Sequence, residues 1–263
     1  KNNFHQFQPL FYQIATAGLE PSAISFPFRR VFHNKPNVHF RLAKLEYVDT
    51  PHKTIRTDIG ELSYDYLMIC TGADTNYFNN ESISQHSLGM KSTGEALTIR
   101  NTILSNFEKA LNTNDPREQE SYLNIAIVGG GPTGVEMAGA IAEMKKYVLP
   151  KDYPELDFDL MQIYLLEAGP CILNGMTNFS SSNSTKYLQN LGVHVLTGAL
   201  VTGYDGNIVY LTDRSINCRS LIWAAGVTSK RIPGLPEDIY TRNNRIKVNR
   251  FNRIVDLNDV FAL

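Results

Sequence analysis

A short stretch in the middle of the chain, from Asn124 to Glu136, constrains the fold most strongly. Its sequence Asn-Ile-Ala-Ile-Val-Gly-Gly-Gly-Pro-Thr-Gly-Val-Glu joins an apolar strand to a helix through closely spaced glycines. Gly129, Gly131 and Gly134 have the G-x-G-x-x-G spacing that provides a tight turn, backbone approach to a pyrophosphate and close packing of helix on strand. We therefore predict a dinucleotide-binding α/β unit with a phosphate at the helix N-terminus.

The remaining residues of this loop fit the same prediction. Pro132 suits the first turn of a helix, where its missing N–H is not needed. We predict that the whole loop contacts the cofactor, which adds Gly130, Pro132 and Thr133 to the candidate binding residues.

An acidic residue, Glu167, ends the apolar run that begins at Ile163. A carboxylate at the end of the second strand accepts hydrogen bonds from the ribose 2′-hydroxyl of NAD and repels a 2′-phosphate. We predict that Glu167, with Ala168 beside it, favours NADH over NADPH. Glu167 follows Gly134 at a longer distance than the usual ~20 residues, because residues 147–158 have no helical period and form an insertion. This insertion is predicted to be a surface excursion or part of the mouth of the site.

Composition narrows the function classes. The chain of 263 residues carries 25 basic and 26 acidic side chains, and without a basic stripe we predict no nucleic-acid partner. The three cysteines, Cys70, Cys171 and Cys218, have no C-x-x-C spacing, so we predict incidental thiols, with Cys70 buried. No apolar run reaches the ~18 residues of a membrane-spanning helix. The histidines are scattered, and no metal site is predicted.

Two β-meanders end in similar ways. Residues 37–70 predict one meander, with strands at 38–48, 53–57 and 66–70, which ends in Thr71-Gly72. A second, built on a turn at Asp205-Gly206, ends in the run 221–226. Two such endings predict two related domains, each finishing a sheet beside a ligand crevice.

Other segments are predicted from their periodicity and polarity. Residues 92–111 predict a helix, 112–120 a polar break and hinge, and 259–263 a buried strand. Because 174–185 is rich in Ser and Asn, the helix that leads to Leu191 is expected to start late. The segment 232–236, with two prolines, is expected to be an exit linker.

Several motifs together resemble one family, the type II NADH:quinone oxidoreductases of the two-dinucleotide-binding-domain flavoproteins. They lie throughout the chain: Gln-Pro-Leu-Phe-Tyr-Gln-Ile-Ala-Thr-Ala-Gly at 8–18, Thr-Gly-Ala-Asp-Thr-Asn-Tyr-Phe at 71–78, the glycine loop at 128–139, Leu-Pro-Lys-Asp-Tyr-Pro at 149–154 and Trp-Ala-Ala-Gly-Val at 223–227. The insertion at 149–154 is the most diagnostic, because general disulfide reductases and ferredoxin reductases usually lack it.

The resemblance implies a domain organisation. Residues 96–229 would form a complete Rossmann-like NADH domain with its β-meander. Residues 1–95 and 230–263 would belong to a FAD-type domain. Family members carry another glycine fingerprint for FAD near their start and a Gly-Asp, quinone and membrane-anchoring region near their end. These motifs are not in the sequence, so we expect an internal fragment that holds FAD weakly or not at all.

The resemblance also implies a reaction, in which NADH gives hydride to FAD and the flavin passes electrons to a quinone. Glu136 would lie near the nicotinamide, although a helix dipole alone favours an acid there by ~0.3–1 kcal/mol. Ala225 and Gly226 would line the passage to the nicotinamide, and Thr71 and Gly72 the seam between the cofactors. Family members imply a cytoplasmic protein, peripheral to the inner face of the cell membrane, and allow a homodimer.

Two alternatives stay open at this point. A sulfide:quinone-type flavin reductase would need two cysteines within reach of each other. A non-catalytic fragment or sensor would bind NAD(H) without passing on its electrons.

Overall fold

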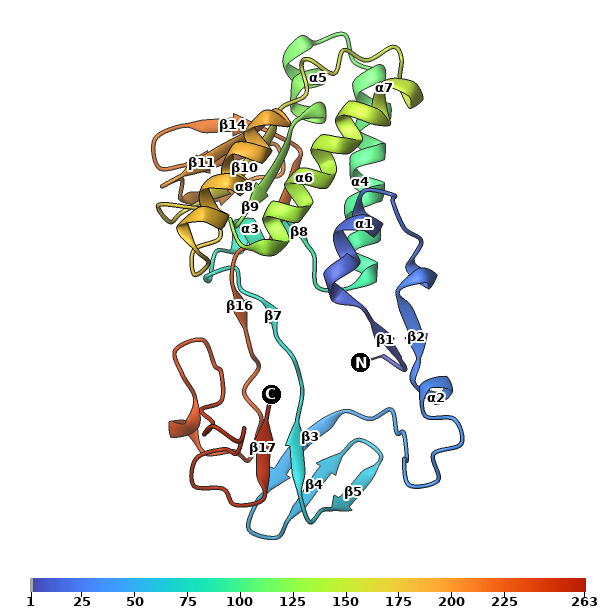
Figure 1. Ribbon diagram of the computed structural model, residues 1–263, viewed down its shortest axis with the longest axis vertical. Helices are drawn as coiled ribbons and strands as arrows, with labels where there is room; N and C mark the ends of the chain where they lie inside the picture. The colour runs from blue at the N-terminus through green and yellow to red at the C-terminus, as the bar shows by residue number, and fades with distance from the viewer. Residues whose placement is uncertain (1) are drawn as a thin grey trace. The chain divides into compact units, whose positions relative to one another are not determined.

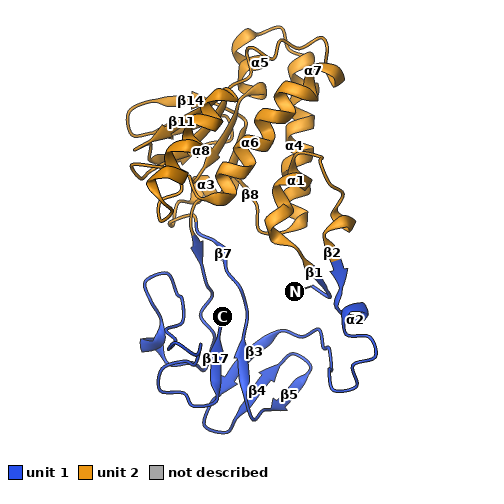
Figure 2. Ribbon diagram, viewed as in Figure 1, with its two compact units in different colours: residues 1–5, 26–76, 227–263 blue, residues 6–25, 77–226 orange. Residues whose placement is uncertain are grey.

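The computed structural model describes residues 2–263, which form two compact units. Unit 1 contains residues up to 5, 26–76 and 227–263, and unit 2 contains residues 6–25 and 77–226 (Figure 2). Residues 6–25 thus pack with the unit that carries the glycine loop, where α1 (Phe11–Ala15) contacts α4 (Thr93–Leu111) and α6 (Pro132–Tyr147). The sequence motif at 8–18 gave no sign of this, because packing of distant segments leaves no local pattern.

Unit 2 is built on a parallel sheet (Figure 1). Its strand order is β11-β10-β9-β15-β8, and every neighbouring pair is parallel. The strands are β8 (Leu88–Gly89), β9 (Ile125–Val128), β10 (Ile163–Glu167), β11 (Val193–Thr197) and β15 (Ser220–Trp223). This is the predicted Rossmann-like α/β unit.

The central strand β9 is buried along its whole length, and its alternate residues enter two different cores. Ile125 and Ile127 pack in the core formed with α1, α4, α6 and the helix α8 (Asn178–Asn190). Ala126 and Val128 pack in the core formed with the meander β12 (Val201–Tyr204), β13 (Ile208–Leu211) and β14 (Ser215–Asn217). A strand covered on both faces explains the continuous apolar run in the sequence.

The helices of unit 2 partly follow the predictions. The helix predicted at 92–111 is α4, and Ser92 caps it by accepting a hydrogen bond from the Glu95 N–H. The polar break predicted at 112–120 is confirmed only over 112–115, between the end of α4 at Leu111 and the start of α5 (Pro116–Leu123). Asp115 accepts from the Arg117 N–H and Pro116 occupies the first turn, so a cap and a proline start the helix despite its polar composition.

Two further expectations need correction. Helix α8 does not start late, because Thr177 caps it by accepting from the Ser180 N–H. The insertion at 147–158 is not only a surface excursion. It contains the short α7 (Leu149–Asp152), and its Phe158 is buried with its ring edge-on to Phe107 of α4. The remaining short elements of unit 2 are η1 (Gln8–Leu10), η2 (Pro21–Ala23) and α3 (Glu81–His86).

Unit 1 consists of small sheets around a separate core. The antiparallel sheet β3-β4-β5 contains β3 (Leu45–Asp49), β4 (Thr54–Thr57) and β5 (Gly60–Ser63), and β6 (Leu67–Ile69) pairs in parallel with β17 (Val260–Ala262). The other elements are β1 (Phe4–Gln6), β2 (Ser25–Pro27), α2 (Phe28–Val31), β7 (Asp74–Thr75), β16 (Val227–Thr228) and η3 (Glu237–Ile239). The predicted C-terminal strand is present as β17. The predicted meander is confirmed only in part: its first two strands are the shorter β3 and β4, but the third strand of that sheet is β5. The strand predicted at 66–70 is β6, which pairs with β17 in a separate sheet.

Two expectations for unit 1 are wrong. The strand expected at 38–48 begins only at Leu45. An alternation of apolar and polar residues marks a segment that could form a strand, but it does not provide the neighbouring strand with which the segment must pair. The segment 232–236 is no linker, since Ile232 and Leu235 are buried in the core of unit 1. The Pro233 carbonyl accepts a hydrogen bond of 2.9 Å from the Val48 N–H of β3.

Candidate nucleotide-binding site

A cavity of about 630 Å³ lies at the carboxyl ends of the parallel strands of unit 2. Gly129 follows β9, Glu167 ends β10 and Ala224 follows β15, so three neighbouring strands deliver residues to one place. Open α/β sheets bind their ligands in this position. We call it the glycine-loop pocket. Its lining residues are Tyr77, Phe78, Asn80, Ile83, Val128, Gly129, Gly131, Leu166, Glu167, Ala168, Ala199, Leu200, Val201, Trp223, Ala224, Ala225 and Gly226.

The glycines of the loop each meet a different steric demand. Gly129 has a φ of +113°, and a Cβ added there would lie 2.8 Å from the Ala225 nitrogen. A Cβ on Gly134 would collide with the Gly129 carbonyl oxygen, so only glycine lets α6 pack this closely. A Cβ on Gly131 would meet nothing within 4 Å. That open space at the start of α6 fits the approach of a phosphate to the backbone.

Glu167 is held in place by backbone amides on two sides. Its Oε2 accepts a hydrogen bond of 2.6 Å from the Gly130 N–H, and its Oε1 accepts one of 2.6 Å from the Gly169 N–H. Each carboxylate oxygen can accept a further hydrogen bond. The two amides therefore fix the carboxylate at the pocket wall and leave it able to accept from ligand hydroxyls.

The structure brings most predicted binding residues together. The glycine-loop pocket is lined by Gly129, Gly131, Glu167, Ala168, Ala225 and Gly226. The other predicted loop residues, Gly130, Pro132, Thr133 and Gly134, form the turn and the first turn of α6.

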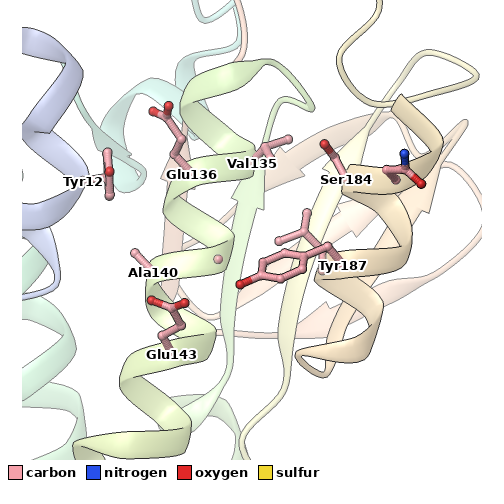
Figure 3. A pocket seen from close by; sticks show the side chains of 10 residues that line it. Tyr12, Val135, Glu136, Ala140, Glu143, Ser184 and Tyr187 are labelled. Carbon is pink, nitrogen blue, oxygen red and sulfur yellow. The ribbon is translucent and has the colours of Figure 1, made fainter. Parts of the chain in front are cut away.

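Glu136 lies in a second, smaller pocket of unit 2. This helix pocket, of about 440 Å³, lies between α1, α6 and α8. Figure 3 shows Glu136 and Glu143 on α6, Tyr12 on α1, and Tyr187 on α8. Burial raises the pKa of the Glu136 carboxyl above its ordinary value. Glu136 and Glu167 therefore line different pockets, although both come from segments beside the same loop.

Thr71 and Gly72 line a pocket of unit 1. This Thr71–Gly72 pocket, of about 660 Å³, includes the basic side chains of Lys44, Lys230 and Arg231. Gly72 has a φ of +70°, a left-handed conformation that glycine adopts without strain. Two acidic side chains, Asp58 and Asp74, line the same pocket, and the Asp74 Oδ2 lies 3.1 Å from the Lys230 Nζ. A small excess of positive charge remains, which suits an anionic ligand.

The three cysteines have different environments. Cys70 is exposed, so the prediction that it is buried is wrong: it follows the last residue of β6 and lines the Thr71–Gly72 pocket. Cys218 is buried, its Sγ donates to the Asn124 carbonyl at 3.2 Å, and burial raises its pKa to about 12. A neutral, enclosed thiol is unsuited to dithiol redox chemistry.

The sequence did not identify the aromatic side of the glycine-loop pocket. Tyr77 and Phe78 precede α3, while Trp223 ends β15. The Trp223 ring lies 6.1 Å from that of Tyr77 and 6.5 Å from that of Phe78, measured between centroids. Trp223 could have been predicted as a pocket residue, because it stands at the end of a parallel strand. No local pattern in the sequence indicated that Phe78 would contact it.

The comparisons with known proteins agree with this geometry. The family model described as pyridine nucleotide-disulphide oxidoreductase matches residues 1–263. The chain belongs to this family. Its parallel sheet with a meander and its glycine loop have the arrangement that the sequence resemblance implied.

Individual relatives and solved structures allow a more specific comparison than the family model does. The chain is 33% identical over 99% of its length to the type II NADH:quinone oxidoreductase Ndh of Mycobacterium tuberculosis, and covers 57% of that relative. It is 28% identical to the external alternative NAD(P)H-ubiquinone oxidoreductase B1 of Solanum tuberosum, with coverage of 99% and 49%. The structure of NDH2 from Plasmodium falciparum in complex with NADH has a TM-score of 0.89 and 26% identity, with coverage of 99% and 57%. The chain therefore spans about half the length of these relatives.

Residues 2–263 contain no candidate for a metal site or for a membrane-spanning helix. No group of three or more His, Cys, Asp or Glu side chains in this range is arranged to hold a metal ion. None of the helices described there combines the length and apolar character that crossing a membrane requires.

Proposed function

We propose that the protein oxidises NADH, passes the hydride to a flavin and delivers the electrons to a quinone. The observation that carries the nucleotide assignment is the placement of Glu167, fixed by the Gly130 and Gly169 amides beside the open space at Gly131. A fixed carboxylate recognises two ribose hydroxyls, and a helix N-terminus binds the pyrophosphate. The relatives that are named as NADH:quinone oxidoreductases support the reaction.

The flavin is assigned to unit 1. The Thr71–Gly72 pocket has the volume of a cofactor site and contains three basic side chains. The basic residues of this pocket exceed its acidic residues, Asp58 and Asp74, by one, although Lys230 is paired with Asp74 and Arg231 with Glu237. This excess of positive charge and the left-handed Gly72, which lets the backbone approach, support a group with a pyrophosphate. When bound, FAD would supply the two-electron chemistry. The protein residues position it and exclude competing reactions.

Glu136 is assigned a role in hydride transfer to the flavin. Its support is the family position of the residue and the raised pKa of its carboxyl. A matched variant, Glu136→Gln, keeps the shape and removes the charge. The quinone partner, and with it a peripheral attachment to a membrane, belongs to the same proposal and is supported by the names of the relatives.

Stopped-flow absorbance on the flavin-loaded protein tests the proposal. NADH should bleach the flavin band, and added quinone should restore it. Glu136→Gln should slow bleaching by roughly tenfold, equivalent to ~1.4 kcal/mol in the barrier. If NADH binds and the flavin stays oxidised, the protein is a nucleotide-binding sensor and the proposed reaction is wrong. Reduction by sulfide and not by NADH would favour the sulfide:quinone class.

A further inference from the structure

Phe78 has an unusual backbone conformation at the edge of the glycine-loop pocket. Its φ is +52°, and the next residue, Asn79, has a φ of +59°. Asn adopts the left-handed region readily, but a bulky aromatic residue does so rarely. The Phe78 side chain is also 62% exposed, although it lines an apolar pocket. An observed strain of this kind, kept at a ligand cavity, is a basis for a functional hypothesis.

The Phe78 ring is placed on one particular side of the pocket. It lies edge-on to Trp223, with an interplanar angle of 65°. Trp223 is buried, ends β15 and is in register with Val128, which directly precedes Gly129. The ring of Tyr77 packs on the same tryptophan. Phe78 thus packs against Trp223, which Tyr77 also contacts, and it lines the cavity with an exposed side chain.

The strand order gives the direction in which a dinucleotide extends. Glu167 ends β10, the glycine loop follows β9, and Trp223 ends β15, with β9 between the other two. Neighbouring strands lie ~4.8 Å apart, so the Glu167 and Trp223 strands are separated by ~10 Å. With the adenosine ribose at Glu167 and the pyrophosphate at the glycine loop, the second nucleoside extends towards β15.

We propose that Phe78 positions the nicotinamide half of the dinucleotide, an assignment that rests on the proposed NADH site. A flat aromatic ring packs well against a second flat ring, such as that of nicotinamide. Phe78 has no acid or base function, so it acts as a positioning residue. Its role is to favour ligands that carry the nicotinamide ring over ligands that end at the second ribose.

Calorimetric titration with two probes, NADH and ADP-ribose, tests this role. ADP-ribose keeps the adenosine, the pyrophosphate and the second ribose but lacks the nicotinamide ring. Phe78→Ala should weaken NADH binding by about tenfold and leave ADP-ribose binding unchanged. Phe78→Tyr should retain the wild-type preference, because it keeps the ring. Phe179→Ala is the matched control, since Phe179 is also an exposed phenylalanine of unit 2 but lies on α8, outside the pocket lining.

Phe78→Ala removes only the ring, whereas Phe78→Gly removes the ring and also relieves the strain of the positive φ. Glycine adopts a positive φ freely, so this variant should be at least as stable to heat as wild type and should still lose the preference for NADH. Equal loss of NADH and ADP-ribose binding in Phe78→Ala, or an unchanged NADH affinity in both variants, would overturn the role of Phe78. If the wild-type protein binds neither probe, the proposed NADH site itself is wrong. This result can be told apart from the two outcomes above, which would overturn only the role of Phe78.

Discussion

The two large pockets of the molecule are each lined by a glycine with a left-handed backbone, but the side chains around these glycines differ. In unit 1, the chain leaves β6 and turns at Gly72, whose φ is +70°. In unit 2, it leaves β15 and turns at Gly226, whose φ is +74°. Each glycine lines a cavity beside the end of its strand. The repeated ending in the sequence therefore reflects a repeated turn, and each turn lies at a candidate ligand site.

The side chains around these turns differ. The glycine-loop pocket in unit 2 is mainly apolar, with one fixed carboxylate, Glu167, and a helix N-terminus next to it. The Thr71–Gly72 pocket in unit 1 contains three basic and two acidic side chains instead. We propose that the shared turn defines where a ligand binds and that the neighbouring charges select which one. This difference also explains why one pocket was easier to assign from the sequence, because a glycine loop is a local motif and scattered basic residues are not.

The largest expected effect comes from distorting the glycine loop while leaving unit 1 intact. In Gly134→Ala the new methyl group meets the Gly129 carbonyl oxygen, and overpacking of this kind costs ~1–3 kcal/mol. We expect a lower melting temperature and at least tenfold weaker NADH binding, with the flavin content unchanged. Thermal unfolding, nucleotide titration and the flavin absorbance check the three expectations.

Gly139→Ala is the matched control on the same helix. Its methyl group would lie 3.7 Å from a Leu188 methyl carbon, an ordinary contact. Alanine is favoured over glycine inside a helix by ~1 kcal/mol, so this variant should be slightly stabilised and bind NADH normally. Equal damage in both variants would show that α6 is sensitive to any added methyl group, and the steric account of the loop would fail.

A smaller effect is expected from the turn in unit 1. A Cβ on Gly72 would meet nothing within 4 Å, so Gly72→Ala carries only the cost of a left-handed backbone, ~1–2 kcal/mol. The flavin-to-protein ratio after purification should fall. ADP-ribose affinity should stay within roughly twofold of wild type, as for independent sites. A loss of ADP-ribose binding with full flavin content would reverse the assignment of the two pockets.

The smallest effect concerns the pH dependence of stability at Glu136. Burial raises its pKa above the ordinary value of 4.5. The protonated carboxyl is favoured in the folded state, so its contribution is fully present below pH 4.5 and is lost as the pH rises through the folded pKa. Glu136→Gln should therefore gain stability relative to wild type between pH 4 and neutral pH, as urea unfolding at about pH 4 and pH 7 would measure. A constant difference across this range would contradict the raised pKa.

The local motifs of unit 2 predicted its fold well. The strand–glycine–helix run predicted β9, the turn and α6, and the Asp205-Gly206 turn predicted the meander. These features depend on neighbours in the sequence. Helix α5 was missed even though Asp115-Pro116 is a local start signal, because the polar residues around it were given more weight than the cap.

Features that depend on distant contacts could not be predicted. The exposure of Cys70 follows from its place beyond the end of β6, and the burial of Ile232 from packing against β3. The separation of Glu136 from the glycine-loop pocket depends on which face of α6 each residue occupies and what packs there. Phe78 reaches its pocket only through contact with Trp223, far away in the sequence.

The central claim is that Glu167 selects NADH, and competitive titration of NADH and NADPH tests it most directly. The wild-type protein should bind NADH at least about tenfold more tightly than NADPH, a difference of ~1.4 kcal/mol. Glu167→Ala should reduce this preference, because it removes the acceptor for the ribose hydroxyls and the repulsion of a 2′-phosphate. Equal affinities in the wild-type protein, or a preference unchanged in Glu167→Ala, would contradict the account.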